Sequence, residues 1–263
     1  MLQFCSLYSG SSGNSFLVKN NNTNILVDSG VSAKKIVEGL TSINTSIENI
    51  EAILVTHEHI DHIKSLGTLS SKYNIPVYAN NKTWDAINGE KDKISSGNRK
   101  VFNTFENFEV GSLKILPFST PHDAADPCGF NIYSENQKLS IATDLGHINN
   151  TILKHLEGSS SIMLEANYDP EILKFSSYPY LLKKRIDSPN GHLSNKMSGD
   201  AICKLIDSGL SQALLIHLSR ENNFPELAYK TVEEELFNNN YCNSDINFSI
   251  APRNNPSQLF NCI

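Results

Sequence analysis

The stretch His57-Glu58-His59-Ile60-Asp61-His62 decides the fold of this 263-residue chain. It follows the apolar run Ile53-Leu54-Val55, a pattern typical of a strand that is covered on both faces. A loop that leaves the carboxyl end of such a strand can turn several side chains into one cleft, where α/β sheets bind ligands. The first two histidines can bind one metal ion, while the aspartate and the last histidine turn toward a second. Imidazole and carboxylate ligands suit zinc, manganese or iron.

Outward from this stretch, strand patterns dominate the first half of the chain, and helical patterns are interspersed. The predicted strands cover residues 3–8, 15–19, 24–28, 52–56, 77–79, 113–118, 129–133, 139–143, 162–164, 213–217 and 248–251. The predicted helices cover residues 32–40, 63–73, 195–208 and 226–237, with Ser32 and Ser194 as candidate N-caps. Together these patterns predict a layered α/β fold. No low-complexity linker interrupts them, so we expect a single domain over residues 1–263.

Composition excludes several classes of protein. No apolar stretch approaches the roughly 18 residues that a membrane span needs, and the first residues lack the pattern of a signal peptide. The five cysteines are scattered, without a CxxC pair, so we expect reduced thiols in a cytoplasmic protein. The net charge of −6 disfavours a non-specific nucleic-acid binder, although a local site can still be positive on an acidic protein.

The HxHxDH spacing resembles the signature of the metallo-β-lactamase fold superfamily. That pattern continues with a lone histidine, an aspartate and a final histidine, each after a strand, and this chain has His122, Asp144 and His217 at those places. The resemblance implies an αββα sandwich, with two mixed β-sheets flanked by helices. It also implies two divalent metal ions, Zn²⁺ or Mn²⁺, with iron possible. The implied ligands are His57, His59 and His122 for the first metal, Asp61, His62 and His217 for the second, and Asp144 as a bridge between them.

Asp28 ends another predicted strand and matches the supporting aspartate of the superfamily. The resemblance implies that it orients the ligand loop from behind. The alternative is an aspartate that only shapes a turn. His147 and His155 have no place among the ligands, and we expect them behind the site or on the surface.

The motif Gly191-His192-Leu193-Ser194 precedes the clearest predicted helix, at its positive end. In phosphodiesterase branches of the superfamily, a histidine in this region meets the scissile phosphate. The resemblance therefore implies that His192 stabilises the phosphorane or protonates the leaving oxygen. We expect Asp61 to take part in catalysis as well. The alternative for His192 is a capping or core histidine.

Three further segments resemble the bacterial YycJ/WalJ group, to which a 5′-to-3′ exonuclease activity on double-stranded DNA is assigned. They are Tyr8-Ser9-Gly10-Ser11-Ser12-Gly13-Asn14-Ser15, Glu165-Ala166-Asn167, and Tyr178-Pro179-Tyr180-Leu181-Leu182-Lys183-Lys184-Arg185-Ile186. Ser11 and Asn14 could approach the substrate, or the turn could be a plain hairpin connection. Lys183, Lys184 and Arg185 form a candidate basic patch for the phosphate backbone, or else a solvated helix face.

These observations predict a metal-dependent phosphodiester hydrolase that uses a bridging hydroxide on a dinuclear metal centre. DNA is the expected substrate and partner, and a membrane is not expected. One alternative is a small-molecule phosphodiesterase, such as one for cyclic esters, or another small-ester hydrolase of the same fold. A third hypothesis is a metal-binding scaffold without catalytic activity, against which the complete ligand set argues.

Overall fold

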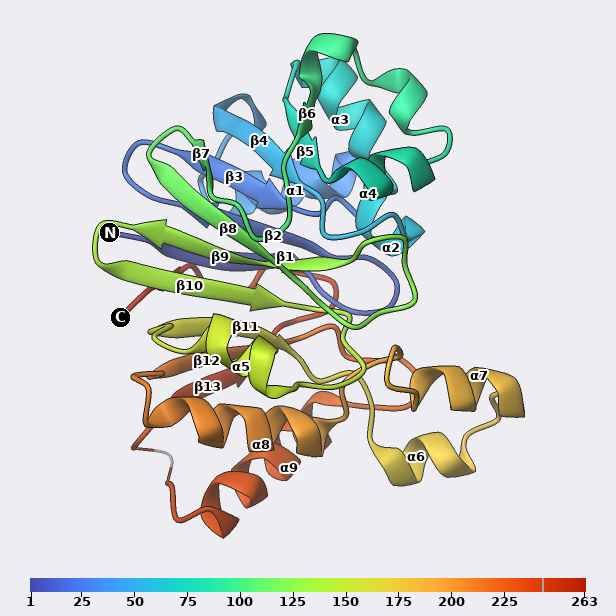
Figure 1. Cartoon of the computed structure of the whole chain (residues 1–263), viewed down its shortest axis with the longest axis vertical. Helices are drawn as coiled ribbons and strands as arrows, with labels where there is room; N and C mark the ends of the chain where they lie inside the picture. Colours follow the sequence, from blue (N-terminus) through green and yellow to red (C-terminus); the bar gives the residue numbers. More distant parts are fainter. Residues whose placement is uncertain (243) are drawn as a thin grey trace.

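The computed structural model describes residues 1–242 and 244–263. Within that part of the chain, two seven-stranded sheets pack face to face (Figure 1). The N-terminal sheet has the order β14 (Phe260–Asn261), β1 (Gln3–Tyr8), β2 (Ser15–Lys19), β3 (Asn24–Val27), β4 (Ile50–Leu54), β5 (Val77–Ala79), β6 (Arg99–Val101). The C-terminal sheet has the order β13 (Asn247–Ile250), β12 (Gln212–Ile216), β11 (Ser161–Glu165), β10 (Gln137–Ala142), β9 (Cys128–Ser134), β8 (Leu113–Ser119), β7 (Phe108–Val110).

Helices cover the outer face of each sheet (Figure 1). Those on the N-terminal side are α1 (Ala33–Ser42), α2 (Ile60–Ile63), α3 (Leu66–Tyr73) and α4 (Asn81–Ala86). Those on the C-terminal side are α5 (Asn150–Leu156), α8 (Asn195–Ile206) and α9 (Pro225–Asn238), while α6 (Pro170–Phe175) and α7 (Tyr180–Ile186) project beside them. Short 3₁₀ turns lie at Ile47–Asn49, Lys91–Lys93 and Ser96–Asn98. This arrangement confirms the predicted αββα sandwich.

Both sheets are mixed, and they are mixed in the same way. In the N-terminal sheet, the strands from β14 to β3 pair antiparallel and those from β3 to β6 pair parallel. In the C-terminal sheet, β7 to β10 pair antiparallel and β10 to β13 pair parallel. The prediction of two mixed sheets is therefore confirmed. The parallel strands of each sheet end at a common edge, which is where side chains can gather.

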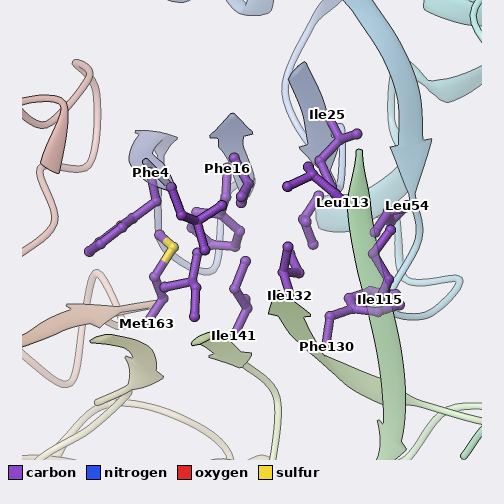
Figure 2. Packing of buried hydrophobic residues seen from close by; sticks show 14 of the residues in the cluster. Phe4, Phe16, Ile25, Leu54, Leu113, Ile115, Phe130, Ile132, Ile141 and Met163 are labelled. Carbon is purple, nitrogen blue, oxygen red and sulfur yellow. The ribbon is translucent and has the colours of Figure 1, made fainter. Parts of the chain in front are cut away.

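The core between the sheets is formed by large apolar side chains that face one another, among them Phe4, Phe16, Phe130 and Ile141 (Figure 2). A second apolar cluster lies under each helical layer. Strands such as β3 and β4 are therefore covered on both faces, which explains why their sequences are continuously apolar.

Some predicted boundaries were wrong for a local reason. Strand β4 ends at Leu54 instead of residue 56, because the backbone N–H of Thr56 bonds to the Asp28 carboxylate at 2.9 Å. The single helix predicted at 63–73 is divided into α2 and α3. The division lies at Ser65, whose backbone N–H and hydroxyl both donate to the carbonyl of Ser29.

Other local predictions agree with the structure. Ser32 caps α1 and Ser194 caps α8, each by accepting a hydrogen bond from a backbone N–H in the first turn. The five cysteines are free thiols, and four of them are buried. Among the described residues, no helix combines the length and the apolar character needed to cross a membrane.

Candidate metal centre

The predicted ligand residues meet at the edge where the parallel strands of both sheets end, beside α2 in Figure 1. The loop after β4 supplies His57 and His59, and α2, which follows it, supplies Asp61 and His62. The others follow β8, β10 and β12. The structure brings all seven together, in overlapping groups whose ligand atoms lie within 4.8 Å of one another: His57, His59 and His122; His57, His62 and Asp144; Asp61, His62 and His217.

The first group consists of three histidines whose ring nitrogens converge. The Nε2 atom of His122 lies 3.3 Å from Nδ1 of His59. His122 donates its Nδ1–H to the carbonyl of Gly191 at 2.9 Å, so its Nε2 carries a lone pair. His57 donates its Nδ1–H to the hydroxyl of Thr56 at 3.0 Å, so its Nε2 atom also carries a lone pair. The lone pairs of His122 and His57 therefore lie beside the ring of His59, an arrangement in which three histidines can bind one cation.

The second group consists of Asp61, His62 and His217. Oδ2 of Asp61 lies 3.6 Å from Nε2 of each histidine. In both rings the Nδ1 atom is occupied, in His62 by the Asp28 carboxylate at 2.7 Å and in His217 by Asp144 at 2.9 Å. Both Nε2 atoms therefore face the same space as the Asp61 carboxylate.

Asp144 lies between the two groups. Its Oδ1 atom is 3.6 Å from Nε2 of His122, which belongs to the first group. Its Oδ2 atom is 3.1 Å from Nε2 of His62, which belongs to the second. One carboxylate thus faces both groups with different oxygens.

Two buried atoms test whether these residues fit a metal ion. The Nε2 atoms of His57 and His217 have no hydrogen-bond partner among the described residues. A buried polar atom without a partner is costly, and a bound ion is one of the few ways to satisfy it. The donors are imidazole nitrogens and carboxylate oxygens, which suit zinc, manganese or iron. The cluster is therefore consistent with a metal site.

The electrostatics of the cluster favour neutral rings for His57 and His122 and a charged carboxylate for Asp144. Burial lowers the pKa of His57 well below its usual value and also lowers the pKa of His122. For Asp144, burial alone would raise the pKa, but the neighbouring His217 and His62 hold it well below the usual range. For these two histidines, burial alone would lower the pKa, and the Asp144 carboxylate raises it above the usual value instead. A charged carboxylate at the centre is what a cation requires.

Asp28 lies behind His62 and has the contacts that its predicted supporting role requires. Its carboxylate is fully buried and accepts hydrogen bonds from His62 Nδ1 at 2.7 Å, from Thr56 N–H at 2.9 Å and from the Thr56 hydroxyl at 2.8 Å. These bonds fix the ring of His62 so that Nε2 points into the cluster.

Glu165 is a site residue that the sequence analysis noted only as part of a resembling segment. Its buried carboxylate accepts hydrogen bonds from His192 Nδ1 at 2.8 Å and from the N–H groups of Leu145 at 3.0 Å and Leu193 at 3.2 Å. It also lies 3.2 Å from His217 Nδ1, whose nearer carboxylate is that of Asp144. It thereby joins four segments of the C-terminal rim. The signal that could have identified it is its place at the end of an apolar strand, the same place that His217 has after β12.

His192 lies between the two groups. Its ring centroid is 5.2 Å from that of His122 and 5.3 Å from that of His217. Its side chain is 19% exposed, whereas the side chains of His122 and His217 are 1% exposed. Burial alone would lower its pKa, but Glu165 raises it above the usual value. Because Nδ1 is bonded to Glu165, Nε2 is the ring nitrogen available to a substrate.

The three predicted basic residues on α7 point in different directions. The ammonium of Lys183 donates to the carbonyls of Lys174 at 2.8 Å and Ser176 at 2.6 Å. The ammonium of Lys184 lies over the ring of Tyr180, 5.0 Å from its centroid. Arg185 instead pairs with the carboxylate of Asp123, with NH2 to Oδ1 at 3.1 Å. The three cations therefore do not form one patch.

The remaining predicted residues have distinct positions. Ser11 is exposed in the β1–β2 turn. Asn14 is fully buried, and its amide nitrogen lies 3.2 Å from His62 Nε2, so it contacts a residue of the ligand cluster. A contact of Asn14 with substrate stays a prediction. His147 donates to the carbonyl of Pro189 at 2.9 Å. The ring of His155 stacks on two phenylalanines away from the cluster, as expected for a histidine outside the site.

Comparison with known proteins identifies the class. The family model of the metallo-beta-lactamase superfamily matches residues 8–188, and the chain belongs to that superfamily. Solved structures agree on the fold: zinc-bound PqqB from Methylobacterium extorquens matches with a TM-score of 0.72 at 14% identity, covering 98% of this chain and 100% of that one. The human short-form tRNase Z matches with a TM-score of 0.67 at 14% identity, and each chain is covered completely, at 100%.

Within the superfamily, the chain belongs to the family of the WalJ and YycJ proteins. It is 38% identical to exodeoxyribonuclease WalJ of Streptococcus pneumoniae, over 88% of this chain and 86% of WalJ. It is 36% identical to exodeoxyribonuclease YycJ of Bacillus anthracis, over 89% of each chain. These relatives are enzymes, and the chain has the buried His/Asp cluster of such hydrolases. The prediction that it is an enzyme is therefore confirmed.

Proposed function

We propose that this protein is a metal-dependent phosphodiesterase that removes nucleotides from the 5′ ends of double-stranded DNA. The observation that carries the proposal is the position of His192, held by Glu165 between the two groups of ligands. A proton donor beside a cationic site matches the needs of phosphodiester cleavage, in which a charged phosphate is attacked and an alkoxide leaves. The names of the WalJ and YycJ relatives support DNA as the substrate.

The ligand groups described above would hold two divalent cations, zinc or manganese, with iron as a further possibility. His57, His59 and His122 would bind the first, Asp61, His62 and His217 the second, and Asp144 both. When bound, such cations neutralise charge on a phosphodiester and lower the pKa of water to about 7, so that hydroxide forms at neutral pH. The unpartnered nitrogens of the two histidine groups support this assignment.

The protein's own side chains then have separate tasks. Glu165 holds Nδ1 of His192, so that a proton on Nε2 can pass to the leaving oxygen. Asp61, whose side chain is 23% exposed, can accept a hydrogen bond from the attacking water and orient it. Asp28 keeps the ring of His62 in place. Each task uses a contact that fixes the tautomer or the orientation of the acting group.

Substrate binding is proposed for residues around the cluster. Arg185 is the best placed of the α7 cations, because its partner Asp123 lies 3.4 Å from Nε2 of His122. Lys183, Lys184, Ser11 and Asn14 stay candidates from the sequence. We further propose that residues 1–263 act as one domain, in the cytoplasm, where free thiols persist.

A panel of substrates tests the proposal. The purified, metal-loaded protein is incubated with 5′-labelled duplex DNA, single-stranded DNA, RNA, cyclic nucleotides and bis(p-nitrophenyl) phosphate. We expect labelled mononucleotides to appear from the duplex before shorter DNA fragments accumulate. Turnover confined to the small esters would refute the nuclease proposal. A fully metal-loaded protein without any turnover would indicate a non-catalytic scaffold.

A further inference from the structure

The C-terminal sheet presents a series of side chains at the rim of the metal centre. Asp144 follows β10, Glu165 ends β11 and His217 follows β12. The next parallel strand, β13, ends at Ile250, and Arg253 follows three residues later. Because neighbouring parallel strands end at the same edge of a sheet, Arg253 occupies the fourth place in this series.

The guanidinium of Arg253 is only partly satisfied. Its NH2 donates to the carbonyl of Leu218 at 2.9 Å, and Leu218 directly follows His217. Its NH1 is buried and has no hydrogen-bond partner among the described residues. A buried, charged donor without an acceptor is unfavourable, and such a group in a native protein calls for an explanation, for example a bound ligand.

The β1–β2 turn is shaped to receive this guanidinium. A Cβ atom added at Gly10 would lie 2.3 Å from Arg253 NH1 and 3.0 Å from the carbonyl of Leu218. Only glycine therefore leaves room for the arginine here, and its φ of +132° is also one that other residues rarely adopt. The same turn contacts the metal centre, because the hydroxyl of Ser9 accepts the backbone N–H of His217 at 2.7 Å. This contact links Arg253 to the ligand-bearing segment.

A second cation lies close to the first. Arg220 follows Leu218, the residue whose carbonyl accepts the NH2 of Arg253, by two positions. Burial, and after it the positive charge of Arg220, lowers the pKa of Arg253. Arg220 is 80% exposed, and its nearest ion pair is a 3.9 Å contact with the adjacent Glu221. Two like charges beside each other, one of them with a free buried donor, are stabilised when an anion binds between them.

We propose that Arg253 and Arg220 form an anion-binding site that holds a phosphate of the substrate strand next to the phosphodiester that is cleaved. This inference rests on the proposed function, since its ligand is a nucleic-acid phosphate. The rings of His122, His192 and His217 form a row. Arg185 lies at the His122 end of this row, because it pairs with Asp123, which contacts His122. Arg253 lies at the His217 end, because it bonds to the carbonyl of the next residue, Leu218. The substrate strand then crosses this row, with the scissile phosphate at His192.

The test compares two substrates of one metal-loaded protein. Duplex DNA has neighbouring phosphates, whereas bis(p-nitrophenyl) phosphate has none. For Arg253→Met we expect the ratio of kcat/KM on DNA to kcat/KM on the small ester to fall about ten-fold. The slope of log KM for DNA against log salt concentration falls by about one, as expected for one lost phosphate contact. Arg253→Lys retains the charge and keeps most of that salt slope. Arg220→Met gives a smaller change in the same direction.

Arg99→Met is the matched control. Arg99 is also partly buried and donates to two carbonyls, those of Ile94 at 3.0 Å and Lys91 at 2.8 Å, but it lies at the start of β6, in the other sheet. If Arg253 only braces the fold, Arg253→Met behaves like this control, with a lower melting temperature but an unchanged ratio and salt slope, and the inference is overturned. If the wild-type protein cleaves the small ester but not DNA, the proposed substrate itself fails, a result that the wild type alone reveals.

Discussion

The N-terminal sheet brings its side chains to the metal centre through one loop, whereas the C-terminal sheet brings one side chain from the end of each of several strands. Both sheets have the same arrangement of antiparallel and parallel strands. In the first, residues 57–62 hold four of the ligands and turn together as one unit. In the second, the contributors are separated by stretches of chain that include whole strands or helices. The N-terminal rim therefore depends on local chain geometry, and the C-terminal rim depends on strand register.

Two equivalent aspartates sharpen this comparison. Asp28 follows β3 and Asp144 follows β10, each on the strand where antiparallel pairing changes to parallel. Both have a left-handed backbone, with φ of 62° and 54°. Asp28 lies behind a histidine, while Asp144 reaches the middle of the cluster. The same fold position thus serves as a support in one sheet and as a ligand candidate in the other, depending on which side chains lie around it.

The largest effect on activity is expected from replacing the aspartate of the C-terminal sheet, Asp144. Asp144→Ala removes the carboxylate that faces both groups, so we expect the protein to lose bound metal and more than about 10⁴-fold of its phosphodiesterase activity. Elemental analysis after desalting measures the metal. An unchanged metal content would contradict the assignment of Asp144 as a ligand. Asp28→Asn is the matched comparison and should retain most of the metal.

A second variant separates chemistry from metal binding. His192→Ala should retain bound metal and lose about 10²- to 10⁴-fold of turnover on both DNA and bis(p-nitrophenyl) phosphate, because a positioned proton donor is lost. Elemental analysis and initial rates give the two readouts. His155→Ala is the control, since that ring stacks on Phe105 and Phe118 outside the cluster. Normal turnover of His192→Ala would remove His192 from the mechanism.

The two supporting carboxylates can be compared directly. Glu165→Gln removes the charged acceptor that faces donors from three other segments, at Leu145, at His192 and Leu193, and at His217, whereas Asp28→Asn disturbs only His62 and Thr56. We expect about 100-fold lower kcat for Glu165→Gln and about 10-fold weaker metal binding for Asp28→Asn. Competition with a chelating dye measures metal affinity. Equal losses of kcat in the two variants would mean that the C-terminal rim does not depend on Glu165 as a shared support.

The smallest effect is expected from the helices that follow the two aspartates. Ser32 caps α1, and Asn149 caps α5 by accepting the N–H of Ile152 at 3.0 Å. Both caps are exposed, so Ser32→Ala and Asn149→Ala should each lower the free energy of unfolding by about 1 kcal/mol. Urea titration of the metal-loaded protein gives the value. Loss of metal from either variant would show that the helix, and not only the strand end, determines the rim.

Much of the fold could be predicted from local pattern. Continuous apolar runs identified most of the central strands, and N-cap residues marked the starts of α1 and α8. The three-residue strands β6 and β7 and the short helices α4 to α6 were missed, because segments of this length carry little periodic signal, and α7 was considered only as an alternative. The end of β4 was misplaced because a long-range bond from Thr56 to Asp28 replaces the sheet pairing there.

The sequence by itself determined the loop of residues 57–62, because its ligand types are adjacent and need no other segment to be recognised as a metal motif. Only the tertiary structure decided that Glu165 supports both His192 and His217, that Arg185 and not Lys183 approaches the site, and that Arg253 joins the rim. The physical reason is the range of the interactions. Hydrogen bonds within a turn depend on neighbouring residues, whereas contacts between strand ends depend on the register and packing of two whole sheets.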